Sequence, residues 1–415
     1  MYNPVINKPQ KIIIWQDKQN TGAIGWIVIH NLVNGVAGGG LFMHHSASLQ
    51  EVKDLAYTMS LKNSLQSSIF GGGKGGIKFD PFHPEASSVL KRFLQDNSEI
   101  IKNEWCTGGD LNTTTKDIST HLEEVTDLKS PFICLANMLE KNEGIKIDLE
   151  KFHQRLFFPE NELFTIEQVI TGYSLFKILE TEIKKTNPKP KIIIQGFGKV
   201  AKAFCYWIQS TYEIVGICER DWFIYNPQGI HIAPLLSLEI FDTHAFKSNR
   251  NFSFTERKPE ETSEDFLLKF LNHTQGDIFC PCAVRYSITK KILNALISHT
   301  FVHSSLNSPL IISGANNVFE EKQLITKAFK NNITVFPEWL TNSGSALLFL
   351  EALKYQSPLI EWKDFIKRRI SNRIISFLAA AKNLSHLHKL NIYEACCYLS
   401  QRFLDEDKQK INKVA

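Results

Sequence analysis

Membrane spans and dense charge tracts are both missing from this chain of 415 residues. No apolar run approaches the ~18 residues that a membrane-spanning helix needs. The first eleven residues, MYNPVINKPQK, lack the apolar core of a signal peptide. The net charge is only +4, and no dense Lys/Arg tract occurs. We therefore expect a cytoplasmic protein with neither a membrane nor a nucleic acid as partner.

The eight cysteines lack the spacing of a disulfide framework or a zinc site. Cys280 and Cys282 are one residue apart and Cys396 and Cys397 are adjacent, but neither pair has a second half at ligand spacing. The two histidines at 44 and 45 also have no cysteine or carboxylate spaced to join them. We expect buried free thiols and no metal.

Glycine, in contrast, is concentrated around one lysine. The stretch 59–81, MSLKNSLQSSIFGGGKGGIKFDP, places Lys74 in a run of five glycines, twelve residues after Lys62. Glycines remove Cβ atoms, so we expect a sharp turn in which Lys74 is the only side chain and a substrate can approach closely. A Walker phosphate loop is excluded, because Gly75 follows Lys74 where a Ser or Thr should hold magnesium.

Lys62 is predicted to lie near the end of a helix. Apolar residues recur at roughly helical spacing from Leu49 onward, with Glu51 and Asp54 near the start. Taken alone, Lys62 is typical of a solvated lysine at a helix C-terminus. If Lys62 and Lys74 converge on one pocket, each raises the free-energy cost of charging the other. This lowers the pKa of at least one of them toward neutrality, which suits a general base. The same pair would also bind a carboxylate.

Asp110 follows two glycines in the segment 104–118, EWCTGGDLNTTTKDI. An isolated Asp or Thr before a helical run is most often a cap, and Thr113 or Thr114 fits that role as well. If Asp110 lies opposite the two lysines, however, its carboxylate would complete a site that contains an acid, a base and an anion-binding pair of lysines. Such a site needs no metal.

A dinucleotide fingerprint begins at Gly196. An apolar strand leads into Gly196, Gly198 and Ala201, the pattern G-x-G-x-x-A, and then into an amphipathic helix. The second glycine lets a pyrophosphate reach backbone amides at a helix N-terminus. A second strand, 213–218, ends at Glu219, where an acid should meet the adenosine ribose. Glu219 favours NAD, although Arg220 beside it leaves NADP open.

Together these motifs resemble the Glu/Leu/Phe/Val dehydrogenase family, and leucine-specific members most of all. The resemblance runs nearly end to end, and its segments keep the family's order: IIIWQDKQNTGAIGWIVIHN, VAGGGLFM, MSLKNS, GGGKGGI, GGDLNTT, IQGFGKVA, DIFCPCAV, ISGANNVF and FPEWLTNSG.

The resemblance implies reversible, NAD-dependent oxidative deamination of an L-amino acid to a 2-oxo acid and ammonium. Lys62 is implied to hold the substrate α-carboxylate, Lys74 to be the catalytic lysine that activates water, and Asp110 to be the acid/base. Gly38, Gly39 and Gly108 are implied substrate contacts. The implied cofactor contacts are Gly196, Gly198, Lys199, Val200, Glu219, Asn316 and Asn342.

Substrate choice follows from a missing cation. Glutamate dehydrogenases of this family carry a lysine where this chain has Gly38, and without it a buried γ-carboxylate would be unpaired. Gly38 and Gly108 are both the smallest residue, which suggests a roomy side-chain pocket. We expect an apolar substrate, leucine or another branched-chain amino acid first and phenylalanine second; a glutamate-specific enzyme is disfavoured.

Some positions depart from the family pattern. Phe42 stands where an arginine is usual, and Asn342-Ser343-Gly344-Ser345 replaces Asn-Ala-Gly-Gly. These changes leave open a catalytically impaired relative that only binds a nucleotide, although Lys62, Lys74 and Asp110 are retained. Residues 131–163 are longer than the usual connection, and a lid, a subunit contact or drift all fit.

The order of the elements predicts an α/β protein. We expect a substrate-binding, catalytic and dimerisation domain over 1–150, a Rossmann-type doubly wound dinucleotide domain over 151–345, and C-terminal helices over 346–415 that return to the first domain. Strand-like runs at 11–15 and 24–30 open the first domain. By resemblance, the protein should be a homo-oligomer, from a dimer up to an octamer.

Overall fold

The computed structural model describes residues 8–65, 69–183, 189–239 and 243–414, with side chains of the last helix described up to residue 405. Most of the N-terminal stretch that we searched for a signal peptide lies outside the described residues. The chain divides into two units. The first comprises the described residues up to 155, residues 349–357 and those from 397 onward, and the second comprises 156–348 and 358–396.

This division differs from the predicted boundaries mainly in the C-terminal helices. The helix α14 (Gly344–Lys354) ends in the first unit and most of α16 (Ile392–Val414) belongs there, but α15 (Trp362–His388) groups with the second unit. The reason is that α15 packs along α7 (Ile166–Glu182), and Lys382 of α15 forms an ion pair of 2.7 Å with Glu182.

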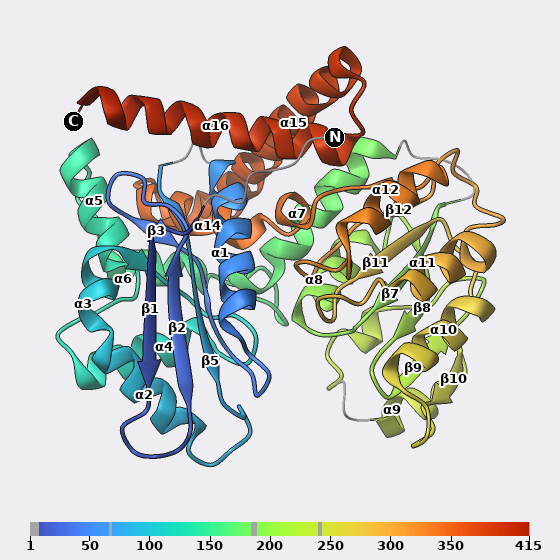
Figure 1. Ribbon diagram of the computed structural model, residues 1–415. Helices are drawn as coiled ribbons and strands as arrows, with labels where there is room; N and C mark the ends of the chain where they lie inside the picture. The colour runs from blue at the N-terminus through green and yellow to red at the C-terminus, as the bar shows by residue number, and fades with distance from the viewer. Residues whose placement is uncertain (1–7, 66–68, 184–188, 240–242, 415) are drawn as a thin grey trace. The chain divides into compact units, whose positions relative to one another are not determined.

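The described residues of the first unit form a six-stranded mixed sheet in the order β1-β2-β5-β3-β6, with β4 also paired to β5 (Figure 1). Strands β1 and β2 run antiparallel to each other and β2 runs antiparallel to β5, whereas β3, β4, β5 and β6 are mutually parallel. Their bounds are β1 Lys11–Gln16, β2 Ile24–Ile29, β3 Ala37–Gly38, β4 Leu41–Met43, β5 Gly71–Lys78 and β6 Trp105–Cys106.

Two apolar cores cover the two faces of this sheet. Side chains alternate along β2, so Ile27 and Ile29 face one core while Trp26 and Val28 face the other. The first core is completed by α2 (Ala86–Asp96), α3 (Ser98–Asn103) and α4 (Thr115–Val125), and the second by α1 (Leu49–Ser64). Figure 1 shows α1 lying along β2 and β5.

The glycine run around Lys74 is a strand, and our prediction of a sharp turn was wrong. The segment GGGKGGIK forms β5, in the middle of the sheet. A Cβ at Gly72 would lie 2.2 Å from the backbone nitrogen of Ser60 in α1, and one at Gly75 would lie 2.5 Å from the Trp105 ring. The glycines are therefore required by close packing on both faces of the strand, because no side chain fits there.

The segment 131–163 contains two helices of the first unit, α5 (Ile133–Glu143) and α6 (Leu149–Leu156). The rings of Phe132 and Phe152 pack edge to face at 5.0 Å. Arg155 donates a hydrogen bond of 2.6 Å to the Ala352 carbonyl and lies over the Tyr355 ring. These contacts hold α6 against residues 349–357 of the same unit.

The described residues of the second unit form a seven-stranded sheet in the order β10-β9-β8-β7-β11-β12-β13. The strands β8, β7, β11, β12 and β13 are parallel, and β9 and β10 run antiparallel at one edge. Their bounds are β7 Lys191–Gln195, β8 Glu213–Cys218, β9 Trp222–Tyr225, β10 Ser253–Glu256, β11 Ile278–Pro281, β12 Leu310–Ile311 and β13 Thr334–Val335. The chain goes from β7 to β8 on one side and returns to β11 on the other, so the strand order reverses at β7, as in doubly wound folds.

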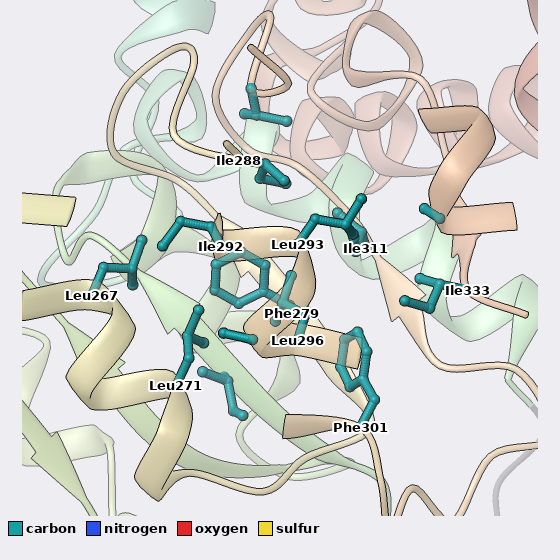
Figure 2. Packing of buried hydrophobic residues seen from close by; sticks show 14 of the residues in the cluster. Leu267, Leu271, Phe279, Ile288, Ile292, Leu293, Leu296, Phe301, Ile311 and Ile333 are labelled. Carbon is teal, nitrogen blue, oxygen red and sulfur yellow. The ribbon is translucent and has the colours of Figure 1, made fainter. Parts of the chain in front are cut away.

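One face of this sheet packs against α10 (Ser263–His273), α11 (Lys290–Ala295) and α12 (Lys322–Lys330). Figure 2 shows Phe279 of β11 among Ile292, Leu293 and Leu296, with Leu267 and Leu271 of α10 beside them. Elsewhere in the unit, α8 (Lys199–Ile208) packs so closely on α7 that a Cβ at Gly172 would lie 2.3 Å from the Ala203 carbonyl carbon.

The shorter helical segments of the second unit are α9 Thr243–Lys247, α13 Glu338–Thr341, the 3-10 turns Ala233–Leu235 and Leu359–Glu361, and a π-helical turn Leu296–Thr300. Among the described residues, every helix is too short or too polar to cross a membrane.

The packing of β5 predicts unequal effects of two alanine substitutions. Gly72→Ala would strike the helix backbone at 2.2 Å, whereas Gly73→Ala would place its Cβ 3.0 Å from the Trp105 ring, a contact that an adjustment of a few tenths of an ångström relieves. We expect Gly72→Ala to lower the free energy of unfolding by about 3 kcal/mol and Gly73→Ala by about 1 kcal/mol. Urea denaturation followed by far-UV circular dichroism measures both. Equal losses would contradict the close contact between α1 and β5.

Candidate active site

Lys74 is buried in the middle of β5, with only 3% of its side chain exposed. Its cross-strand partner is Val28, which belongs to the core beneath α1, so the Lys74 side chain leaves the sheet on the α1 face. The neighbouring positions on that face are Gly72 and Gly76. Lys74 is therefore the single long side chain that β5 sends toward α1 between two glycines.

Lys62 lies in the last turn of α1 and is buried, as the sequence predicted for its place in the helix. The helix begins at Ser48, whose hydroxyl accepts a hydrogen bond of 3.2 Å from the Glu51 backbone. Next to Lys62, the Asn63 amide donates to the carbonyls of Gly71, at 2.7 Å, and Gly38, at 3.2 Å. This bridge fixes the last turn of α1 on β5 and β3.

Asp110 follows β6 and forms an ion pair with Lys74. Its other carboxylate oxygen accepts a hydrogen bond of 2.7 Å from the Leu111 backbone. The helix cap is Thr114, whose hydroxyl accepts from the Asp117 backbone at 3.0 Å, so Asp110 is not the cap of α4. The alternative of a purely capping Asp110 is thereby removed.

The electrostatics join all three side chains. Burial raises the pKa of the Asp110 carboxyl, but the charge and hydrogen bond of Lys74, the Leu111 backbone N–H and the charge of Lys62 together hold that pKa below its usual value. Lys62 therefore acts on the same carboxylate as Lys74. The cluster can hold a carboxylate ligand and can exchange a proton without a metal ion.

The glycines predicted to contact the substrate border apolar and aromatic groups. A Cβ at Gly38 would lie 2.5 Å from the Phe70 ring and 2.8 Å from the Cys106 sulfur, and one at Gly39 would lie 1.8 Å from the Gly73 carbonyl oxygen. At Gly108 the neighbours are Thr115, Phe132 and Phe349, the two rings at 3.4 and 3.7 Å. The volume beside Gly38 is filled, so our inference that this glycine enlarges a pocket was wrong.

The dinucleotide fingerprint forms the predicted strand, turn and helix. Gly196 has a φ of +87°, which favours glycine, and Gly198 precedes the first residue of α8, Lys199. A Cβ at Gly198 would meet nothing within 4 Å. Open space over backbone amides at a helix N-terminus fits a pyrophosphate, so this turn suits a dinucleotide.

Glu219 directly follows β8 and is hydrogen-bonded to the same turn. Its carboxylate accepts hydrogen bonds from the backbone N–H groups of Phe197 and Arg220. The Arg220 side chain is 69% exposed and pairs with Asp221 at 2.7 Å. The carboxylate, and not the guanidinium, is thus fixed at the glycine turn.

Asn316 and Asn342 meet beyond the end of β12. The Asn342 amide donates to the Asn316 side chain at 2.8 Å and to the Gly314 carbonyl at 3.1 Å. A Cβ at Gly314 would lie 2.8 Å from Val200. All the predicted cofactor contacts of the second unit therefore gather where β7, β8 and β12 end.

The positions that depart from the family pattern are packed. Phe42 is buried in the core beneath α1, 2.8 Å from where a Cβ of Gly76 would lie. The Ser345 hydroxyl is 2.7 Å from the Thr171 hydroxyl of α7.

Two residues near the lysines, Asn63 and Phe70, were not singled out from the sequence, and a third, Thr113, was considered there only as a helix cap. Asn63 bridges three elements, Phe70 fills the space beside Gly38, and the Thr113 hydroxyl bonds the Leu41 carbonyl and accepts from the Asp110 backbone at 3.0 Å. The sequence motif MSLKNS contains Asn63, but no local pattern distinguishes Phe70 from any other core phenylalanine.

Family comparison covers both units. Residues 9–127 match the Glu/Leu/Phe/Val dehydrogenase dimerisation domain, and residues 164–395 match the Glutamate/Leucine/Phenylalanine/Valine dehydrogenase model. The chain belongs to the Glu/Leu/Phe/Val dehydrogenase family. The family resemblance drawn from the motifs is confirmed.

Known members of the Glu/Leu/Phe/Val dehydrogenase family are similar at low identity. The chain is 26% identical over 373 residues to the NAD-specific glutamate dehydrogenase of Peptoniphilus asaccharolyticus. The aligned region covers 83% of this chain and 77% of that protein. It is 22% identical over 388 residues to the NADP-specific glutamate dehydrogenase of Synechocystis sp., with 89% and 82% covered. The nearer resemblance to leucine-specific members stays a prediction.

A solved structure shares the fold. The hetero-hexameric glutamate dehydrogenase from Thermus thermophilus, in its Leu-bound form, has a TM-score of 0.68 at 15% identity, covering 96% of this chain and 89% of that chain. The predicted α/β architecture with a Rossmann-type second unit is confirmed.

The ion pair predicts a measurable change in the titration of Asp110. In Lys74→Met the charge and hydrogen bond that lower the Asp110 pKa are lost, while burial, which raises it, remains. We expect the Asp110 carboxyl to titrate at a higher pH than in the wild type. Difference infrared spectra of Lys74→Met against Lys74→Met/Asp110→Asn isolate this carboxyl. An unchanged or lower pKa would contradict the assigned pairing.

Proposed function

We propose that this chain is a nicotinamide-dinucleotide-dependent dehydrogenase that reversibly converts an apolar L-amino acid to its 2-oxo acid and ammonium. The observation that carries the proposal is the pairing of buried Lys74 with Asp110 beside Lys62, in a family whose members are amino acid dehydrogenases. The dinucleotide, held by the glycine turn, Glu219 and the asparagine pair, supplies the hydride acceptor when bound.

Lys62 binds the substrate α-carboxylate in this proposal. It is buried at the end of α1, and its charge already acts on Asp110. A buried lysine is a strong anchor for a carboxylate, because both charges are then partly desolvated and the pair fixes the orientation of the α-carbon.

Lys74 and Asp110 carry out the proton transfers. Loss of the α-hydrogen as hydride and of one amine proton leaves an imine, and water adds to the imine carbon to give the 2-oxo acid and ammonium. The Asp110 carboxylate accepts the proton that the water loses as its oxygen bonds to the imine carbon and returns it to the leaving nitrogen, while the Lys74 ammonium donates a hydrogen bond to that oxygen. The lowered pKa of Asp110 keeps this carboxyl ionised at neutral pH.

The surroundings of the glycines support an apolar substrate. Phe70 and Cys106 border Gly38, and Phe132 and Phe349 border Gly108. A γ-carboxylate in such surroundings would lose its hydration without gaining a partner. Burying an unpaired charge in this way costs on the order of several kcal/mol. Leucine and other branched-chain amino acids fit better, with phenylalanine as the alternative.

NAD is the proposed cofactor. The Glu219 carboxylate lies at the glycine turn, and Arg220 is engaged by Asp221. A 2′-phosphate on the adenosine ribose would meet negative charge there, whereas a 2′-hydroxyl can donate to it.

The test is NADH formation at 340 nm with leucine, valine, isoleucine, phenylalanine and glutamate, with NADP in parallel. We expect turnover of an apolar substrate with NAD, and a loss of at least ~100-fold in kcat for Lys74→Ala with unchanged NAD binding. Lys78→Ala is the matched control, since this lysine ends the same strand but is exposed. Turnover of glutamate alone would refute the substrate class. If none of the five amino acids is turned over while NAD still binds, the protein is a catalytically impaired relative that only binds a nucleotide.

We also propose that the first unit assembles with copies of itself through β1. Residues 9–127 match a dimerisation domain, and on its outer side β1 pairs with no other strand among the described residues. Ile12 and Ile14 on this edge strand are 38% and 66% exposed. Exposed apolar groups on an open strand edge are a recognised route to strand pairing between chains.

Charges on this edge should therefore lower the mass of the assembly. We expect Ile12→Lys/Ile14→Lys to be smaller than the wild type in light scattering after size-exclusion chromatography. Phe82→Lys is the control, because Phe82 is 85% exposed but lies in the loop after β5. An unchanged mass in the double variant would rule out this edge as the interface.

A further inference from the structure

The strongest unexplained feature near the lysines is the filled space beside Gly38. The ideal Cβ position there is 2.5 Å from Phe70 Cε2, 2.8 Å from Cys106 Sγ and 2.9 Å from Phe70 Cδ2. Phe70 itself is only 4% exposed. An aromatic ring from the residue before β5 thus occupies the volume that any side chain at position 38 would need.

This ring lies close to the lysine cluster. Gly38 pairs with Gly72, two residues before Lys74 in β5. Its carbonyl accepts a hydrogen bond from Asn63, the residue after Lys62. The strand β3 is therefore bound by both elements that carry the lysines, β5 through strand pairing and α1 through Asn63, and Phe70 packs against it.

The opposite side of β3 leads to Asp110. Gly38 pairs with Cys106 of β6, and the Cys106 sulfur is the second group that fills the space at position 38. Asp110 follows four residues later. Phe70 and Cys106 pack on β3 beside Gly38. They therefore border the side chain of a substrate that contacts Lys62, Lys74 and Asp110 together.

We propose that Phe70 is a specificity-determining residue, whose ring closes the end of the substrate side-chain subsite at Gly38. This inference rests on the proposed amino acid dehydrogenase activity. A ring fixed by packing limits the length of the substrate side chain that can enter beside it, which disfavours a longer or aromatic one. The preferred substrates are then valine, isoleucine and leucine, and phenylalanine is a poor substrate because it would need the volume that Phe70 fills.

The decisive experiment measures kcat/KM for valine, leucine and phenylalanine in the wild type and in Phe70→Ala. We expect the ratio of phenylalanine to valine to rise at least 10-fold in Phe70→Ala, since a single methylene in a hydrophobic pocket is already worth roughly 10- to 200-fold in discrimination and the substitution removes a whole ring. Phe70→Leu removes less volume, keeps an apolar side chain if the alanine variant fails to fold, and should change the ratio in the same direction.

A buried phenylalanine away from the lysines provides the matched control. Phe93 of α2 is fully buried on the other face of the sheet, where its ring packs edge to face on Trp15. Phe93→Ala should lower the melting temperature and leave the substrate ratio unchanged. A purely structural role for Phe70 would give the same result as Phe93→Ala.

A double-mutant cycle tests the contact itself. Gly38→Ala should lower the melting temperature in the wild-type background, because its Cβ strikes the Phe70 ring, and should have a smaller effect in Phe70→Ala, where only the 2.8 Å approach to the Cys106 sulfur remains. Additive effects would show that Phe70 does not fill this space and would overturn the inference.

The outcomes separate the two proposals. An enzyme that turns over apolar amino acids with the same substrate ratio in both Phe70 variants overturns the role of Phe70 and leaves the proposed function standing. A wild type that turns over none of the amino acids overturns the proposed function, and the role of Phe70 falls with it.

Discussion

The contact between α1 and the glycine strand β5 is the constraint on which the first unit depends. The backbone of Ser60 lies so close to Gly72 that no Cβ fits between them. At the same level, the Asn31 side chain accepts hydrogen bonds from the Gly72 backbone, at 2.9 Å, and from the Ser60 hydroxyl, at 2.6 Å. Polar groups that are buried by this contact are thus hydrogen-bonded across it, which fixes the helix on the strand. Lys62 on the helix and Lys74 on the strand are brought to the same carboxylate by this one contact.

Charge balance follows from that geometry. The cluster of Lys62, Lys74 and Asp110 carries a net charge of one positive unit when both lysines are protonated and the aspartate is ionised. Both lysines are buried. A ligand with a single carboxylate and an uncharged amine neutralises the cluster, whereas a second carboxylate would leave an excess of negative charge in apolar surroundings. The lysine cluster and the aromatic groups around Gly38 and Gly108 therefore support the proposed substrate class for separate reasons, the charge balance of the cluster and the apolar surroundings of the glycines.

Local patterns in the sequence were enough for elements whose cause is local. The helix from Leu49 and the strand 213–218 follow from periodicity, and the turn at Gly196 follows from the need for a positive φ. The glycines of β5 could not be read in this way, because their cause is the approach of Ser60 and Trp105 from distant parts of the chain. The same holds for Gly38, whose space is filled by a residue 32 positions further on, and for α15, whose grouping depends on its contact with α7.

The departures at 342–345 can be judged by the same steric argument. A Cβ at Gly344 would lie 2.1 Å from the Ile170 carbonyl oxygen of α7. The packing therefore requires glycine at this position, and the chain retains it. The serine at 345, where the family has glycine, bonds Thr171 on the same helix. Asn342 keeps its bonds to Asn316 and Gly314. With serine at 343 and 345, Asn342 is bonded to Asn316 and Gly314 and residue 345 is bonded to α7, so the departures are compatible with the proposed cofactor site.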